Sequence, residues 1–274
     1  MTVSNTRVVV LAPFVNSPFS RAVSALCHRE PGVDLAGIIC RRVLNPSRLR
    51  SELRRDGIRL VRKAWRKLVL AEADATGGDE EGLHEIAAQA GVGDQTLKEF
   101  ARKEGIPFIS VGDHNDPGAV SALRSMRPDV VAFTGGGIIR RDLIEAAGRG
   151  IFNTHMGPLP EYRGMDVVEW PILEDRHEEP GLAVTLHFMD RGIDTGPIAR
   201  IERVPILAGD SMERLRKRFE PVMVRLMIEG IRLVRDDALD LRPQTEPEGR
   251  QYFIMHPRLY EEARRRLAMI AAER

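Results

Sequence analysis

Residues 129–153, DVVAFTGGGIIRRDLIEAAGRGIFN, decide the fold. The apolar run 129–133 predicts a buried strand, and a helix expected over 138–147 separates it from a second strand at 150–153. A strand, a helix and a further strand in this order are typical of α/β proteins with a mostly parallel sheet. Ligands of such sheets bind beyond the carboxyl ends of the strands. The glycine-rich turn 134–137 and Asn153 fall at two of these ends.

The same alternation continues on both sides of this stretch. Continuous apolar character at residues 33–40 predicts a parallel strand that is buried on both faces. Asp94 is the expected N-cap of a helix over 94–104. The turn 12–16 has no glycine where a dinucleotide fingerprint needs close backbone approach, which argues against an NAD site. Further strands are expected at residues 7–12, 107–111 and 184–189, and further helices at about 17–29 and 116–127.

The composition is that of a globular protein. The 274 residues, 43% of them hydrophobic, are enough to form a buried core. We find no apolar run long enough for a membrane span and no signal-peptide pattern, so we expect a soluble, cytoplasmic protein without a transmembrane segment. A net charge of +1 gives no general attraction to nucleic acid. Cys27 and Cys40 fit neither zinc nor redox spacing, and we expect no disulfide.

Residues 41–67 depart sharply from this charge balance. They contain eleven basic residues against only Glu52 and Asp56, and apolar residues recur among them at helical spacing. We predict a helical basic insertion over residues 41–90. Three interpretations of its basic face stay open: a solvated helix surface, contact with an anionic membrane, or arginines that bind a phosphorylated substrate.

Three polar residues have the side chains that acyl transfer requires. Asn153 and His155 are separated by a single residue, Thr154, and Asp194 follows in the sequence DTG. An amide can stabilise an oxyanion, an imidazole can donate or accept a proton, and a carboxylate beside the imidazole raises its pKa. Each residue alone also has an ordinary explanation: Asn153 in a local turn, His155 as a hydrogen-bonded interior histidine, and Asp194 in a β-turn.

A metal site built from His155, His187 and Asp194 is a further option. His187 alternates within the strand expected at 184–189, where a side chain typically packs or orients a neighbour. We therefore expect no metal.

Four short motifs follow one another along the chain: Asn153-Thr154-His155, Leu159-Pro160, Tyr162-Arg163-Gly164 and Asp194-Thr195-Gly196. In this order they resemble the formyltransferase catalytic domain, a family that includes glycinamide ribonucleotide, methionyl-tRNA and sugar N-formyltransferases. The resemblance implies a Rossmann-like fold, 10-formyltetrahydrofolate as the formyl donor and an amine as the acceptor. Asn153, His155 and Asp194 match the family's catalytic triad. We predict a formyltransferase catalytic domain at residues 1–206 and a small C-terminal helical extension at 207–274.

The resemblance also indicates which residues surround the triad. The serine of the family pattern N-x-H-x-S-L-L-P is absent from residues 153–160, which affects a substrate contact rather than the catalytic core. The glycine-rich turn lets a flat heterocycle approach the backbone. The expected folate contacts are Phe133, Thr134, Gly135, Gly136, Gly137, Ile138 and Ile193. The expected acceptor contacts are Arg163, Gly164, Met165 and Asp166, with Asp166 also as a helix cap.

Three functions are compatible with these residues. The first is formyl transfer to a small-molecule amine, with an amino sugar nucleotide as one candidate. The second is hydrolysis of 10-formyltetrahydrofolate with water as the acceptor, and the third is a non-catalytic folate-binding homologue. We expect a long amphipathic helix over about 211–235, but neither the strand repeats of an extra barrel nor a strongly basic module, so we do not expect a tRNA acceptor. The sequence leaves homodimer formation open.

Overall fold

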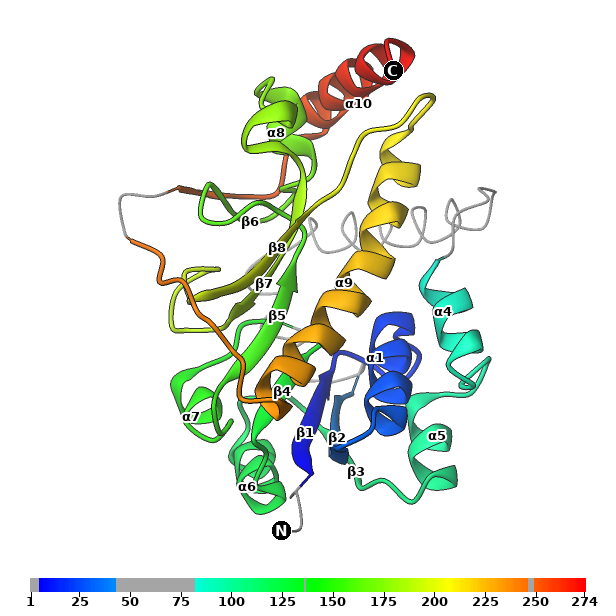
Figure 1. Ribbon diagram of the computed structural model, residues 1–274, viewed down its shortest axis with the longest axis vertical. Helices are drawn as coiled ribbons and strands as arrows, with labels where there is room; N and C mark the ends of the chain where they lie inside the picture. Colours follow the sequence, from blue (N-terminus) through cyan, green and yellow to red (C-terminus); the bar gives the residue numbers. More distant parts are fainter. Residues whose placement is uncertain (1–4, 43–81, 136, 246–248) are drawn as a thin grey trace.

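A seven-stranded β-sheet forms the centre of the molecule (Figure 1). The computed structural model describes residues 5–42, 82–135, 137–245 and 249–274. The strands are, in spatial order, β3 (Phe108–Val111), β2 (Val33–Arg41), β1 (Thr6–Ala12), β4 (Val130–Phe133), β5 (Ile151–His155), β7 (Ala183–Phe188) and β8 (Ile198–Arg203). The first five run parallel, whereas β7 is antiparallel to β5 and β8 to β7. The predicted α/β fold with a mostly parallel sheet is confirmed.

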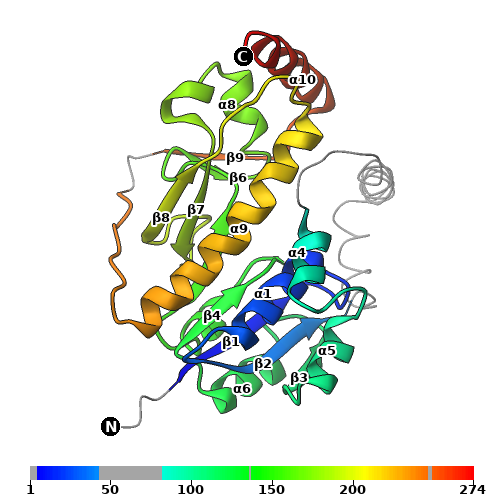
Figure 2. The same cartoon turned by 45° about the vertical axis from the view of Figure 1, so that its right-hand side comes forward.

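Buried residues fill almost the whole length of β1, β2, β4 and β7, which explains the continuous apolar runs in the sequence. In β1, Val8 and Val10 contribute to one hydrophobic core, whereas Val9 and Leu11 contribute to another. Figure 2 shows α9 running across the sheet beside α1, and the long amphipathic helix predicted over 211–235 is thereby confirmed. Among the helices of the first core are α1 (Pro18–Arg29) and α9 (Met212–Arg235), whereas α6 (Pro117–Met126) and α7 (Arg141–Ile144) contribute to the second.

Helix α5 (Leu97–Lys103) begins later than predicted. Its N-cap is Thr96, and the prediction of Asp94 at this position is wrong. Thr96 and Glu99 form a capping box: the Thr96 hydroxyl accepts from the Glu99 N–H at 3.2 Å, and the Glu99 carboxylate accepts from the Thr96 N–H at 2.8 Å. This reciprocal pair satisfies two backbone donors of the first turn, which Asp94 cannot do from its place outside the helix.

Helix α7 is shorter than the helix predicted over 138–147. The side chain of Asn115, from the loop before α6, donates to the Ile138 carbonyl at 2.9 Å and accepts from the Arg140 N–H at 2.7 Å. The Ile138 carbonyl and the Arg140 N–H are therefore hydrogen-bonded to the Asn115 side chain and not to backbone groups of a helical turn. Arg140 keeps an extended backbone and stands directly before the first turn of α7.

The C-terminal part of the chain contributes a strand that the sequence did not reveal. β9 (Arg250–Tyr252) pairs in parallel with β6 (Tyr162–Gly164). Gly164 has φ +98°, and a Cβ atom there would lie 2.2 Å from the Tyr252 carbonyl oxygen. Only glycine allows this close pairing, which accounts for the glycine of the Tyr162-Arg163-Gly164 motif. The boundary proposed at residue 206 stays a prediction.

A buried ion pair joins α8 (Glu169–Leu173) to α9. The Glu169 side chain is fully buried, and each of its carboxylate oxygens accepts a hydrogen bond at 2.7 Å from Arg216. This bidentate geometry fixes α8 against the long helix. The short π-helix η1 (His177–Gly181) follows α8, and α10 (Pro257–Ala272) packs beside α8 (Figure 1).

Most of the predicted basic insertion, residues 43–81, lies outside the described residues. Its last part forms α4 (Leu83–Gln89), which packs on α1. Cys27 and Cys40 are buried, free thiols. Within the described ranges, no helix combines the length and the apolar character that crossing a membrane requires.

Candidate active site

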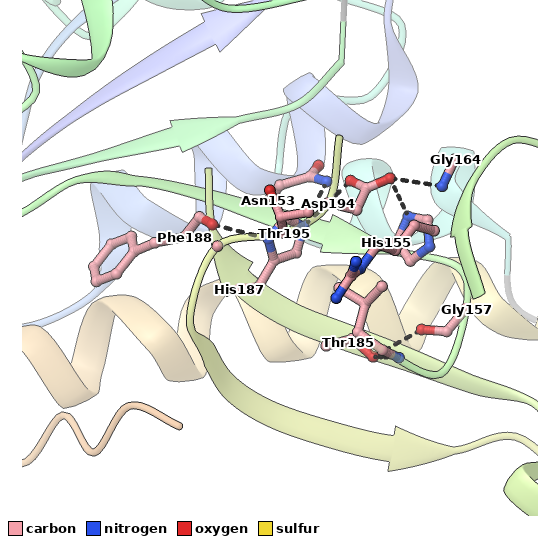
Figure 3. A network of polar contacts seen from close by, with 12 residues as sticks. Asn153, His155, Gly157, Gly164, Thr185, His187, Phe188, Asp194 and Thr195 are labelled. Carbon is pink, nitrogen blue, oxygen red and sulfur yellow. Dashed lines mark hydrogen bonds and ion pairs between the residues drawn. The ribbon is translucent and has the colours of Figure 1, made fainter. Parts of the chain in front are cut away.

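The three predicted catalytic residues lie close together at the carboxyl end of β5 (Figure 3). Asn153 and His155 are two residues apart in β5, and alternation along a strand directs their side chains to the same face of the sheet. Asp194 comes from the loop between β7 and β8. In the register between β5 and β7, Asn153 lies opposite His187. The antiparallel strand β7 therefore adds a second histidine to the group.

The Asp194 carboxylate lies between the two imidazoles. Its Oδ2 atom is 3.5 Å from His155 Nδ1, and its Oδ1 atom is 3.5 Å from His187 Nε2. The Asn153 amide nitrogen is 3.1 Å from the same His187 Nε2 atom. Four side chains from two strands and one loop thus share a single polar network.

Backbone carbonyls decide which nitrogen of each imidazole carries the proton. His155 Nε2 lies 2.8 Å from the Tyr162 carbonyl oxygen, which can only accept, so Nε2 donates and the Nδ1 lone pair of a neutral ring faces Asp194. His187 Nδ1 likewise donates to the Phe188 carbonyl at 2.9 Å. His187 Nε2 then accepts one N–H of the Asn153 amide. Among the described residues the second N–H of that amide has no partner, so it can donate to a ligand.

Burial sets the protonation states of this group. His155 is 7% exposed, and burial lowers its pKa, an effect that the nearby His187 reinforces and that Asp194 opposes. The interaction with Asp194 raises the pKa of His155, as the sequence predicted. The net shift is downward, contrary to the prediction, because desolvation is the larger cause. Burial also raises the pKa of Asp194, but the protonated forms of His155 and His187, which exist at acid pH, and the Gly164 N–H outweigh it and lower that pKa to about 2. At neutral pH the site holds a carboxylate beside a neutral imidazole.

The loop that carries Asp194 has a defined shape. Asp194 has φ +54°, in the left-handed region, and its Oδ2 atom accepts the Gly164 N–H at 2.9 Å. The Thr195 hydroxyl donates to Asp190 at 2.7 Å. A Cβ atom on Gly196 would lie 1.9 Å from the Phe188 carbonyl oxygen. Each residue of the Asp194-Thr195-Gly196 motif therefore has a structural reason: a carboxylate between two imidazoles, a loop hydrogen bond and a close backbone contact.

The residues predicted to contact folate have mixed environments. Phe133 is buried at the end of β4 and pairs with Asn153, and the buried Thr134 hydroxyl donates to the Leu11 carbonyl at 2.8 Å. Ile138 and Ile193 are 71% and 37% exposed. Gly135 and Gly137 have positive φ angles, and Gly136 lies outside the described residues. The assignment of this turn to folate stays a prediction.

The residues predicted to contact the acceptor differ in their solvent exposure and in their hydrogen-bond partners. Arg163 is buried and donates to the Gln244 side chain, and the Gly164 N–H is bound to Asp194. Met165 is 53% exposed. Their assignment to the acceptor likewise stays a prediction.

Asp166 does not act as the helix cap that the sequence suggested. Its carboxylate accepts the Met255 N–H at 2.8 Å and lies 3.6 Å from Arg216, and the residue before α8 is Val168. The carboxylate is drawn away from the helix because the C-terminal segment supplies a backbone donor beside it.

Sequence reasoning missed Gln244 as a neighbour of the site and treated His187 only as a packing or orienting residue. The alternation of His187 in its strand was visible, but its position opposite Asn153 depends on the strand order of the sheet. For Gln244 the sequence offered no signal. Over the described part of the chain, no group of three His, Cys, Asp or Glu side chains is arranged to hold a metal ion.

Comparison with known proteins agrees with these motifs. The model of the formyl transferase family matches residues 7–231. The methionyl-tRNA formyltransferase of Chlorobium phaeovibrioides is 30% identical over 150 residues, which are 55% of this chain and 46% of that protein. That of Anaeromyxobacter sp. (strain K) is 29% identical over 172 residues, 62% of this chain and 51% of that protein. The chain thus spans about half the length of the curated relatives it matches.

Solved structures share the fold at lower identity. Glycinamide ribonucleotide transformylase 1 from Symbiobacterium toebii superposes with a TM-score of 0.53 at 20% identity, over 88% of this chain and 95% of that one. The sugar 3N-formyl transferase WlaRD superposes with a TM-score of 0.57 at 16% identity, over 97% of this chain and 79% of that one. Since the family model matches most of the sequence, the chain belongs to the formyl transferase family.

Proposed function

We propose that this protein transfers the formyl group of 10-formyltetrahydrofolate to the amine of a small molecule. The observation that carries the proposal is the geometry of Asn153, His155 and Asp194, in which an ionised carboxylate lies 3.5 Å from a neutral imidazole beside an amide with an available N–H. Membership of the formyl transferase family supports it. The folate donor is supported by the related fold of WlaRD, which was crystallised with dTDP and 5-N-formyl-THF.

The three side chains can divide the work of acyl transfer. When bound, 10-formyltetrahydrofolate supplies the formyl group, next to the glycine-rich turn and the exposed Ile138 and Ile193. The free N–H of Asn153 donates to the formyl oxygen as negative charge develops on it, a type of contact worth about 100- to 1000-fold in rate. His187 holds the amide in this orientation through its Nε2 atom.

His155 and Asp194 handle the proton. The Nδ1 lone pair of His155 accepts the proton that the attacking amine loses, directly or through Asp194, and the adjacent carboxylate stabilises the resulting imidazolium. The same Nδ1–H then returns the proton to the folate nitrogen from which the formyl carbon departs. One carbon–nitrogen bond forms and one breaks, and the proton ends on the leaving nitrogen.

The acceptor we propose is a small-molecule amine, with an amino sugar nucleotide as the leading candidate. The sugar 3N-formyl transferase fold extends over 97% of this chain, which supports this class. Sequence relatives named methionyl-tRNA formyltransferase make tRNA the alternative to be tested beside it. A cytoplasmic location and a homodimer stay predictions.

The test combines the purified protein with 10-formyltetrahydrofolate, first alone and then with a panel of amines that includes amino sugar nucleotides and methionyl-tRNA. Release of tetrahydrofolate and the mass of the acceptor are followed together. Release that requires an amine, with a product heavier by one formyl group, supports the proposal and names the acceptor. Release of formate without any amine would instead favour the hydrolase, and folate binding without turnover would favour the non-catalytic homologue.

A further inference from the structure

The side chain of Gln244 is hydrogen-bonded through its amide nitrogen to the loop that carries Asp194, here called the catalytic loop, and through its amide oxygen to Arg163 of β6. Gln244 lies between α9 and β9, after the last residue matched by the family model. Its amide nitrogen donates to the carbonyl oxygens of Asp194 at 3.1 Å and of Gly196 at 2.6 Å. Its amide oxygen accepts from the Arg163 guanidinium at 3.3 and 3.2 Å. The two donors and the acceptor of one side chain thus link β6 to the loop that carries Asp194.

Backbone pairing holds Gln244 in this place. Two residues earlier, Arg242 exchanges two hydrogen bonds with Ile198, at 2.8 Å each, so the C-terminal segment runs alongside the end of the catalytic loop. From the other side, Arg163 is buried in β6, where the next residue, Gly164, donates its N–H to the Asp194 carboxylate. Gln244 therefore binds the main-chain carbonyl of Asp194, and the Gly164 N–H binds the Asp194 carboxylate.

Asp194 needs such support because its backbone is in a region that residues with a Cβ atom disfavour. Its φ is +54°, and its carboxylate must stay 3.5 Å from each of two imidazoles. A loop carbonyl without a donor would turn toward water and carry the side chain with it. Gln244 supplies donors to the carbonyls of Asp194 and Gly196, on both sides of Thr195.

We propose that Gln244, held by Arg163, is a positioning residue that keeps the Asp194 carboxylate between His155 and His187. The proposal rests on the proposed function and deepens it, because it makes the C-terminal segment a part of the catalytic site. In this proposal Arg163 holds the Gln244 side chain against the catalytic loop and does not contact the acceptor directly.

Two variants and one control test this. Gln244→Ala removes every contact, whereas Gln244→Glu keeps an acceptor for Arg163 and replaces the donor to the loop carbonyls by an oxygen. Gln251→Ala is the matched control, since Gln251 is an exposed residue of the same type in the same segment. The first readout is amide hydrogen exchange by NMR on the protein without substrate, at two neighbouring positions.

The Gly164 amide reports the carboxylate, since it donates to Asp194, whereas the adjacent Met165 amide donates to the Tyr252 carbonyl in β9. Both Gln244 variants should exchange faster at Gly164 by at least about tenfold and remain unchanged at Met165, and Gln251→Ala should change neither. Unchanged exchange at Gly164 would overturn the proposal. So would equal loss of protection at both amides, because that indicates a general structural role.

The second readout is the kinetics of formyl transfer. Displacing a catalytic group by about 1 Å should lower kcat between about tenfold and a hundredfold in both Gln244 variants, with KM for the folate donor unchanged within about twofold. A kcat that stays within about twofold of the wild type would overturn the proposal even if Gly164 loses protection. If the wild-type protein transfers formyl to no amine, the proposed function fails, and the exchange at Gly164 alone decides whether Gln244 positions Asp194.

Discussion

The replacement of Asp194 by asparagine tests the electrostatics of the site through the stability of the protein. The folded-state pKa of Asp194 is lowered from 3.8 to about 2, and the side chain is 15% exposed. A lowered carboxylate pKa contributes stability that is present above the unfolded pKa and is lost as the pH falls toward the folded pKa. The shift corresponds to roughly 2 kcal/mol at neutral pH, of which about half should be lost by about pH 3.

Asp194→Asn cannot titrate at this position, so it should lack this part of the acid dependence. Urea unfolding followed by tryptophan fluorescence between about pH 3 and pH 6 measures the difference in unfolding free energy from the wild type. That difference should be largest near pH 6 and shrink by about 1 kcal/mol toward pH 3. Asp240→Asn, at an exposed carboxylate, serves as the control. A constant difference across this range would refute the argument that the two imidazoles and the Gly164 N–H hold Asp194 ionised.

Four further measurements test other parts of the structure. Asn153→Ala should lower kcat by about 100- to 1000-fold while the circular dichroism spectrum is unchanged, and a near-normal rate would remove Asn153 from catalysis. Because burial lowers the pKa of His155, the acid limb of kcat/KM should lie below the usual value of about 6.5, and a limb above it would contradict a neutral imidazole. Gly164→Ala should destabilise the protein by about 1–3 kcal/mol in thermal unfolding, because the added methyl group meets a β9 carbonyl 2.2 Å away. Arg216→Met should cost about 3 kcal/mol or more because it leaves Glu169 buried without a partner, and adding Glu169→Leu should recover most of that loss if the unpaired charge is its cause.

Much of the fold was accessible from the sequence because strand and helix periodicity is local. The strand expected at 33–40 and the helix at 211–235 follow from apolar patterns within each segment, and both are present. The two errors have different causes. The N-cap of α5 follows from Thr96 and Glu99, a local capping box that the prediction of Asp94 overlooked. The length of α7 depends on a hydrogen bond to Asn115, 25 residues away in the chain, that no apolar pattern encodes.

The chemical types at the site could be predicted from the sequence: an amide at the end of an expected strand, an imidazole two positions further on, and a carboxylate in an expected turn. The position of His187 opposite Asn153 and the hydrogen bond from Gln244 to Asp194 became visible only in the tertiary structure. Both contacts join segments that are far apart in the chain, and the length of chain between them does not predict their distance in space. The net shift of the His155 pKa likewise depends on the tertiary structure. Desolvation depends on how completely distant elements cover a side chain, and that is a property of the packed molecule rather than of any one stretch of sequence.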